Sequence, residues 1–270
     1  MKQSVFLIIL MSIFNNTCDN SFTIKEIDLP ILLDECVEVD SFKLYAQKVF
    51  YQTGKFPKDG ESVIYQAQRK NLLQWDTLLT SLPGIVKRFI SIDNNYFVLI
   101  KSSNPQEGFS FYKNDKEKWT KLFSWHESQM SVINMHFINN LTGYVIFRLY
   151  KGTSILYETI NGGKSWKKFL LPDDIKKSIL YKNKLFLLHY MAGEKTKISI
   201  IDIPSKKITS YIIDFWAWDF AVTENLNFYL IGIKQGQKGL YYYSPMHNEL
   251  NIITKMPTNN PYFHKVYIII

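Results

Sequence analysis

The chain has 270 residues, of which 46% are hydrophobic and 16% aromatic, and it carries a formal net charge of +8. This composition is ample for a sizeable core and fits a single globular domain. With two cysteines, the chain cannot form a structural zinc site of the kind that has three or four cysteine ligands.

An apolar run near the N-terminus, Val5 to Phe14, is too short to cross a bilayer but is typical of the core of a secretory signal. We therefore expect residues 1–17 to be a signal peptide and the protein to be exported to the periplasm or cell envelope. Cys18 follows at the place where a bacterial lipoprotein carries its acylated cysteine. The preceding residues, Asn15 to Thr17, depart from the usual lipobox, so a lipid anchor is one of two alternatives.

The two cysteines, Cys18 and Cys36, allow two interpretations. In an oxidising compartment they could form one disulfide, whereas lipidation of Cys18 would leave Cys36 as a single thiol. Both lie in residues 18–40, an acidic segment in which residues 19–40 hold seven carboxylates and one lysine. We expect the folded domain to follow this segment, over residues 41–270.

Short aromatic or β-branched runs, separated by polar turns, continue through the rest of the chain. No long window shows a helical period, so the pattern predicts an all-β protein. The clearest expected strands are residues 89–92, 96–100, 185–188, 197–201 and 228–233. The clearest expected turns are residues 93–95, 182–184, 224–225 and 235–239.

A tryptophan or a large aliphatic residue recurs at a near-constant spacing among these strands. Trp75, Trp119 and Trp166 are 44 and 47 residues apart, and Ile208 and Leu250 follow at intervals of 42. Periods of about 40 to 50 residues are typical of propeller blades, in which each sheet packs against the next. The spacing therefore predicts a β-propeller of four-stranded blades, with five blades between residues 41 and 256 and room for a sixth.

The stretch from Thr159 to Trp166 has the composition of a tight hairpin turn. The Asn161 amide can hydrogen-bond nearby backbone, and Gly162 and Gly163 accept a positive φ without a Cβ clash. Trp166 then begins the returning strand, where its ring can lie across the turn and bury a large apolar area. The stretch therefore predicts a tight reversal between two strands.

This octet resembles the Asp-box, or bacterial neuraminidase repeat, whose pattern is Ser/Thr-x-Asp-x-Gly-x-Thr/Ser-Trp. Thr159, Gly163, Ser165 and Trp166 match the pattern, and Asn161 stands where aspartate is usual. The surrounding repeat, residues 131–172, is also similar to the repeats of photosystem II assembly-factor-type propellers. The resemblance implies a β-propeller in which these five residues are structural and lie on a hairpin away from the functional face.

Asp-box propellers include sialidases, which hold a substrate carboxylate with three arginines and use a Tyr/Glu nucleophile pair with an aspartate acid/base. This chain has three arginines in all, Arg69, Arg88 and Arg148, and it lacks the early Arg-Ile-Pro motif of that family. Its five histidines are scattered without metal-type spacing, and no nucleophile elbow, zinc-helix motif or phosphate loop occurs. We therefore expect no catalytic, cofactor-binding or metal-binding residues.

The most suggestive binding residues lie in the stretch from Asp214 to Phe220. Alternation along a strand predicts Trp216, Trp218 and Phe220 on one face of a sheet. Aromatic clusters of this kind form protein-binding hot spots or sugar-stacking platforms, but packing between blades uses aromatic residues in the same way. The same two interpretations apply to Tyr241–Tyr243.

The end of the chain, residues 261–270, predicts one more strand. An apolar strand without a partner would be an aggregation-prone edge. We therefore expect it to pair with residues 42–51 or residues 22–31, so that the terminal strands close the ring. The alternative is a chain that ends within its last blade.

Charge is distributed unevenly, and residues 151–207 hold 12 lysines against five carboxylates. This sector indicates an acidic partner or an anionic surface, or else an ordinary solvated face. The leading hypothesis is a non-enzymatic exported propeller that binds another protein of the cell envelope, as an assembly, immunity or scaffold module. The alternatives are a glycan-binding or sialidase-like glycoside hydrolase and a structural surface lipoprotein. We expect no nucleic-acid partner, and a membrane contact only through a lipid anchor.

Overall fold

The structure is a computed structural model that describes most of the chain in segments. The described residues are 4–9, 23–28, 35–39, 43–51, 60–68, 71–92, 95–102, 108–115, 118–126, 130–150, 152–171, 173–255 and 266–269.

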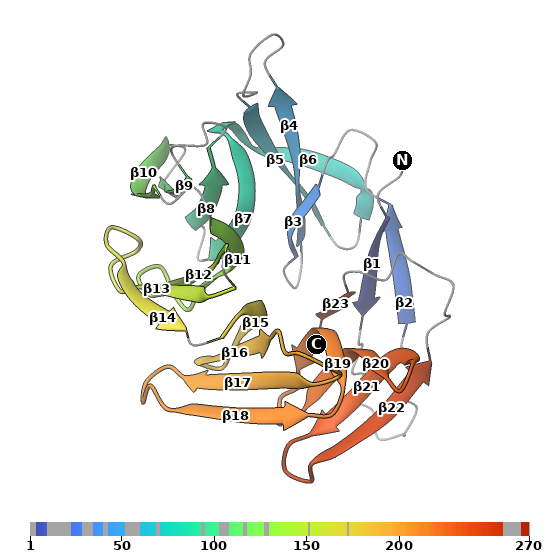
Figure 1. Cartoon of the computed structure of the whole chain (residues 1–270). Coiled ribbons are helices and arrows are strands. Elements are labelled where there is room, and N and C mark those ends of the chain that lie inside the picture. Colours follow the sequence, from blue (N-terminus) through green and yellow to red (C-terminus); the bar gives the residue numbers. More distant parts are fainter. Residues whose placement is uncertain are drawn as a thin grey trace. The chain divides into compact units, whose positions relative to one another are not determined.

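Five four-stranded antiparallel sheets make up most of the described chain (Figure 1). In each sheet, four strands that are consecutive in the sequence are also neighbours in space, with the orders β3-β4-β5-β6, β10-β9-β8-β7, β11-β12-β13-β14, β15-β16-β17-β18 and β19-β20-β21-β22. The bounds of the first three sheets are β3 (Glu35–Val39), β4 (Lys43–Tyr51), β5 (Gly60–Gln68), β6 (Asn71–Pro83), β7 (Ile85–Ile92), β8 (Asn95–Lys101), β9 (Phe109–Asp115), β10 (Lys118–Trp125), β11 (Met130–Phe137), β12 (Gly143–Leu149), β13 (Ser154–Thr159) and β14 (Lys167–Leu171). The bounds of the other two are β15 (Ile175–Tyr181), β16 (Lys184–His189), β17 (Thr196–Asp202), β18 (Ile208–Ile213), β19 (Trp216–Val222), β20 (Phe228–Lys234), β21 (Gln237–Ser244) and β22 (Glu249–Lys255). The predicted all-β fold of four-stranded blades is confirmed.

A further sheet joins strands from both ends of the chain. It contains β1 (Ser4–Ile9), β2 (Thr23–Asp28) and β23 (Val266–Ile269), with β1 antiparallel to β2 and parallel to β23. The expected C-terminal strand is present, but the prediction of its partner is wrong, because β23 pairs with β1. A short apolar run fits a strand as well as a signal core, so its composition alone did not reveal β1. The signal peptide and the closing of a ring by terminal strands stay predictions.

The chain divides into two compact units, and in each unit neighbouring sheets share a hydrophobic core. One unit holds the sheets β3–β6, β7–β10 and β11–β14, and the other holds β15–β18, β19–β22 and the terminal sheet. In the first unit, Phe97 and Phe111 from β8 and β9 pack against Phe137 from β11, with ring centroids 4.2 and 5.8 Å away. In the second, Phe186 from β16 packs against Phe228 from β20 at 6.0 Å. Aromatic residues therefore fill the spaces between stacked sheets, as blade packing requires.

The recurring large residues lie near the start of the fourth strand of each sheet. Trp119 and Leu250 are the second residues of β10 and β22. Trp166 directly precedes β14, and Ile208 begins β18. In the first sheet the fit is looser, because β6 begins at Asn71, four residues before Trp75. The near-constant spacing therefore did mark one equivalent place in successive blades.

The first strand of each four-stranded sheet carries a shift in register near its beginning. The shifts fall between Cys36/Glu38, Val86/Arg88, Val132/Asn134, Ile175/Lys177 and Ala217/Asp219. A β-bulge of this type inserts one extra residue and turns the residues that follow it to the opposite face. A repeated bulge is thus a second feature that the five sheets have in common.

Candidate binding surface

The hairpin between β13 and β14 is held by the side chains of the predicted turn. Thr159 Oγ1 accepts the Gly163 N–H at 2.9 Å and donates to Asn161 Oδ1 at 3.0 Å. Asn161 Oδ1 also accepts the Ser165 N–H at 3.0 Å, and Asn161 Nδ2 donates to Ser165 Oγ at 2.7 Å. Trp166 Nε1 donates to the Gly163 carbonyl at 3.0 Å. All five residues of the octet pattern therefore make hydrogen bonds within the turn itself.

The same turn also packs against the neighbouring sheet of its unit. The Trp166 ring lies 5.3 Å from Phe111, nearly perpendicular to it, and 5.3 Å from Trp125. A Cβ added at Gly163 would lie only 2.1 Å from the Phe111 ring. Trp166 and Gly163 therefore pack against the neighbouring sheet. Because these contacts give the turn a structural role, the candidate binding surface lies elsewhere.

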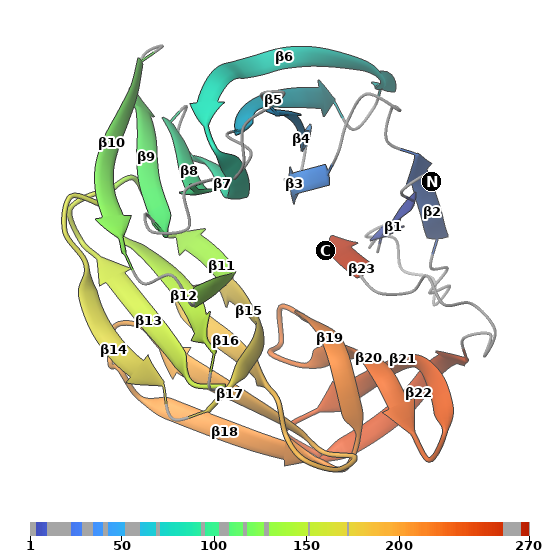
Figure 2. The same ribbon diagram turned by 45° about the horizontal axis from the view of Figure 1, so that its top comes forward.

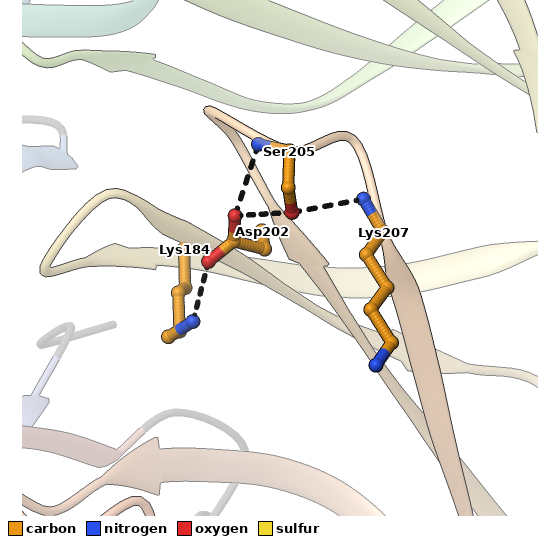
Figure 3. Close-up of polar contacts among 4 residues, drawn as sticks. All are labelled: Lys184, Asp202, Ser205 and Lys207. Carbon is orange, nitrogen blue, oxygen red and sulfur yellow. Dashed lines mark hydrogen bonds and ion pairs between the residues drawn. The ribbon is translucent and has the colours of Figure 1, made fainter.

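The corresponding hairpin of the next sheet, between β17 and β18, is built around a residue that the sequence analysis passed over (Figure 3). Asp202 Oδ1 accepts the Ser205 N–H at 3.1 Å and the Ser205 hydroxyl at 2.6 Å, and Lys184 Nζ donates to Asp202 Oδ2 at 2.6 Å. Ser205 Oγ in turn accepts the Lys207 N–H at 3.4 Å. The hydrogen bond from Lys184, together with those from Ser205, holds the pKa of the Asp202 carboxyl well below its usual range. An aspartate followed three residues later by serine is the signal that could have predicted this turn.

The predicted aromatic face of β19 is divided by its bulge. Trp216 is exposed and Trp218 half-buried, with their rings 6.3 Å apart and nearly perpendicular. Phe220 is fully buried and belongs to the core shared with Phe186 and Phe228. The prediction that all three share one face is therefore wrong, because the bulge between Ala217 and Asp219 interrupts the alternation.

Two residues outside the predicted set complete an exposed group around Trp216. Lys176 Nζ lies 5.8 Å from the centre of the Trp216 ring and 5.1 Å from that of Tyr190, which are distances of cation–π contact. Tyr190 and Trp216 are each 44% exposed. Tyr190 follows the end of β16, Lys176 lies near the start of β15, and Trp216 begins β19. We call Lys176, Tyr190, Trp216 and Trp218 the aromatic patch.

A polar cluster lies beside the patch, where β15 and β17 begin and β16 ends. Lys197 Nζ donates to Asp173 Oδ2 at 2.7 Å, and His189 Nδ1 lies 3.3 Å from the same oxygen. The His189 side chain is buried, and neither ring nitrogen makes a hydrogen bond with suitable geometry in the described residues. Burial lowers the pKa of His189 to about 4, with Lys197 acting in the same direction and Asp173 opposing it. The hydrogen bond from Lys197 lowers the pKa of Asp173.

This cluster predicts a loss of stability in mild acid. Because the pKa of His189 is about 4 in the folded chain and 6.5 ordinarily, the unfolded chain binds more protons between those values. Stability should be complete above about pH 6.5 and should fall by at most roughly 1.4 kcal/mol per pH unit as the pH approaches 4. Thermal unfolding midpoints of the wild type and His189→Phe, followed across this window, measure the effect.

The His189→Phe variant should show a flatter pH dependence, because it removes the titrating group and two ring nitrogens that lack hydrogen bonds. Asp173 contributes little in this window, since a carboxyl with a lowered pKa loses most of its stabilising contribution as the pH falls below its ordinary value of 3.8. Equal pH dependence in the two proteins would contradict the assignment to His189.

A polar contact links the first strands of neighbouring sheets in both units. Arg88 Nε donates to Asn134 Oδ1 at 3.2 Å, and Lys177 Nζ is ion-paired with Asp219 Oδ1. In both cases the acceptor oxygen also accepts the backbone N–H of the residue that follows it, at 2.9 and 2.8 Å. All four residues directly follow the bulge of their strands. At each of these two interfaces, the residues after the bulges are therefore a cationic side chain on one strand and its acceptor on the other.

The remaining predicted residues do not form a site in the described chain. Cys18 lies outside the described residues, and Cys36 is placed only as the backbone partner of Ala46 in β3 and β4. Arg69 also lies outside them, while Arg88 binds Asn134 and the Ile133 carbonyl. Among the described residues, no three His, Cys, Asp or Glu side chains are grouped as ligands for a metal ion. The described segments also contain no helix long and apolar enough to span a membrane.

Comparison with known proteins gives a fold but no family. No protein-family model matches the sequence, and no curated protein matches it. Among solved structures, a puromycin hydrolase superposes with a TM-score of 0.58 at 10% identity, over 88% of this chain and 41% of that chain. A protein from Lactobacillus plantarum superposes with a TM-score of 0.52 at 10% identity, over 96% of this chain and 83% of that one.

A further neighbour is YCF48 bound to a D1 peptide, with a TM-score of 0.49 at 11% identity over 76% of this chain and 71% of that chain. The chain spans about two fifths of the length of the puromycin hydrolase, and the catalytic domain of that enzyme lies outside the match. The sheets and these neighbours together define an all-β protein of the β-propeller class.

Proposed function

We propose that this protein is a non-enzymatic propeller that binds another protein through the aromatic patch. The observation that carries the proposal is the exposure of Trp216 and Tyr190, each 44%, with both rings in cation–π contact with Lys176. Tryptophan and tyrosine dominate the binding energy of protein interfaces, because they bury a large area with few rotatable bonds. An exposed pair that is already oriented by a lysine is therefore suited to an interface.

Charge supports a partner with acidic groups. Residues 151–207 contain seven more lysines than carboxylates, and Lys176 belongs to this sector. Such an excess favours encounter with an acidic surface and weakens with added salt. The apolar run from Val5 to Phe14 supports export and a partner in the cell envelope.

The test is recovery of a specific partner from the source envelope with the tagged full chain. We expect Trp216→Ala to reduce recovery about tenfold or more, since hot-spot tryptophans cost more than 1.4 kcal/mol when truncated. Tyr150→Ala is the matched control, because Tyr150 is an exposed aromatic residue that is not one of the four patch residues. Equal recovery by the Trp216→Ala and Tyr150→Ala variants would contradict the proposal.

A glycan is the second candidate, because the exposed rings of Trp216 and Tyr190 could also stack on sugars. Binding of a glycan that is lost in Trp216→Ala, or turnover of a fluorogenic glycoside that is lost in Arg148→Ala, would favour it over a protein partner. Incorporation of labelled fatty acid at Cys18 without any ligand would favour the structural surface lipoprotein instead.

A further inference from the structure

Within the part of the chain that the structure describes, the outer strand β18 ends its sheet and leaves alternate backbone groups without a partner strand. Among the described residues, β17 is its one hydrogen-bonded neighbour, and Figure 2 shows the two strands side by side. Asp202 N–H donates to the Lys207 carbonyl at 2.9 Å, so the hydrogen-bonded pairs with β17 fall on odd-numbered residues from Lys207 onward. Antiparallel pairs alternate, so Ile208, Ser210 and Ile212 direct their backbone N–H and C=O away from β17.

β18 differs from the other four outer strands in lacking protection against pairing. Charged residues and bulges are the usual means by which an edge strand avoids a second chain. The strands β6, β10 and β22 have interrupted registers, and each contains charged residues. β14 has five residues and begins with two lysines. β18 has an uninterrupted register and the uncharged sequence Ile-Thr-Ser-Tyr-Ile-Ile.

We propose that β18 is a self-association edge that pairs antiparallel with β18 of a second copy of this chain. In a pairing centred on Ser210, Ile208 lies opposite Ile212 of the second copy, and the two Ser210 residues lie opposite each other. The outward backbone N–H and C=O groups of these residues can then hydrogen-bond between the two copies. Ile208 and Ile212 are each 59% exposed in the single chain, so both would lose solvent contact. Cross-strand pairs of β-branched residues stabilise a sheet.

Charge complementarity identifies the occupant as a second copy. Lys206 and Lys207 directly precede β18, and Asp214 directly follows it. In an antiparallel pair centred on Ser210, Asp214 of each copy lies opposite Lys206 of the other. This contact occurs twice by symmetry. The arrangement uses the same edge on both copies, so it closes as a dimer.

The first test is the oligomeric state of the full chain as a function of concentration, measured by analytical ultracentrifugation. The wild type should form a dimer, and Ile212→Lys should raise its dissociation constant about tenfold or more, because it affects two symmetric Ile–Ile pairs. Met246→Lys is the matched control, since Met246 is an exposed apolar residue in the turn before β22, and it should leave the constant unchanged.

A charge-swap experiment separates this pairing from misfolding. Asp214→Lys alone gives a chain with lysines at both ends of β18, and Lys206→Asp with Lys207→Asp gives a chain with carboxylates at both ends. Each variant should lose the dimer by itself, and a mixture of the two should form heterodimers. A monomeric wild type, a dimer that survives Ile212→Lys, an assembly larger than a dimer, or no heterodimer in the mixture would each overturn the proposal.

Discussion

Replacing Lys177 with methionine should lower the free energy of unfolding by about 2 to 4 kcal/mol. The side chain of Asp219 is 8% exposed, and Lys177 is its ion-pair partner across the interface between β15 and β19. Methionine keeps the apolar stem but leaves a buried carboxylate without its cation, which costs far more than the loss of a surface pair. Urea denaturation followed by tryptophan fluorescence measures the change, since Trp216 and Trp218 lie in the same strand as Asp219.

Lys195→Met is the matched control, because it removes one partner of an exposed ion pair. Lys195 Nζ lies 3.8 Å from Asp214 Oδ1, and both side chains are exposed. That exposed pair should contribute less than about 1 kcal/mol. Adding Asp219→Leu to Lys177→Met should restore part of the stability, because the buried charge is then gone. If Lys177→Met destabilised the chain no more than Lys195→Met, the ion pair would not be a significant link between these sheets.

Gly163→Ala should destabilise the first unit by about 3 kcal/mol or more, enough to unfold its hairpin. Gly163 has a φ of +89°, which side chains rarely adopt, and an added Cβ would approach the fully buried Phe111 ring to 2.1 Å. The turn must therefore move away from Phe111, and the hydrogen bond from Trp166 Nε1 to the Gly163 carbonyl would move with it. Thermal unfolding and near-ultraviolet circular dichroism of the tryptophans report both effects.

Gly193→Ala separates the two causes of that effect. Gly193 also has a positive φ, of +76°, but an added Cβ there would have no heavy atom within 4 Å. It should cost only the backbone penalty of about 1 kcal/mol. Equal destabilisation by the two substitutions would show that the contact of the turn with Phe111 contributes nothing.

The sequence was sufficient for the blades because their signals are local and repeated. Aromatic and β-branched runs with polar turns predicted the strands, and the spacing from Trp119 to Leu250 marked the start of the fourth strand in four sheets. The octet from Thr159 to Trp166 predicted a hairpin because its side chains bond to its own backbone. These interactions need no knowledge of distant parts of the chain.

The sequence was insufficient where one residue changes a face or where distant strands meet. The bulge in β19 directs the Phe220 side chain toward the core. A prediction from strict alternation along the strand does not include the extra residue of a bulge. Lys176 and Tyr190 come from different strands than Trp216, so their contact depends on how two sheets stack. The pairing of β1 with β23 joins residues at opposite ends of the chain, which composition cannot match in register.

If the aromatic patch is a protein-binding surface, a cross-linker placed within it should capture the partner. A photoreactive phenylalanine derivative in place of Tyr190 should cross-link one specific protein in the source envelope, and the product should disappear when Trp216→Ala is added. The same derivative in place of Tyr150, which is exposed but outside the patch, should not yield that product. No specific product from position 190, or the same products from both positions, would contradict the account.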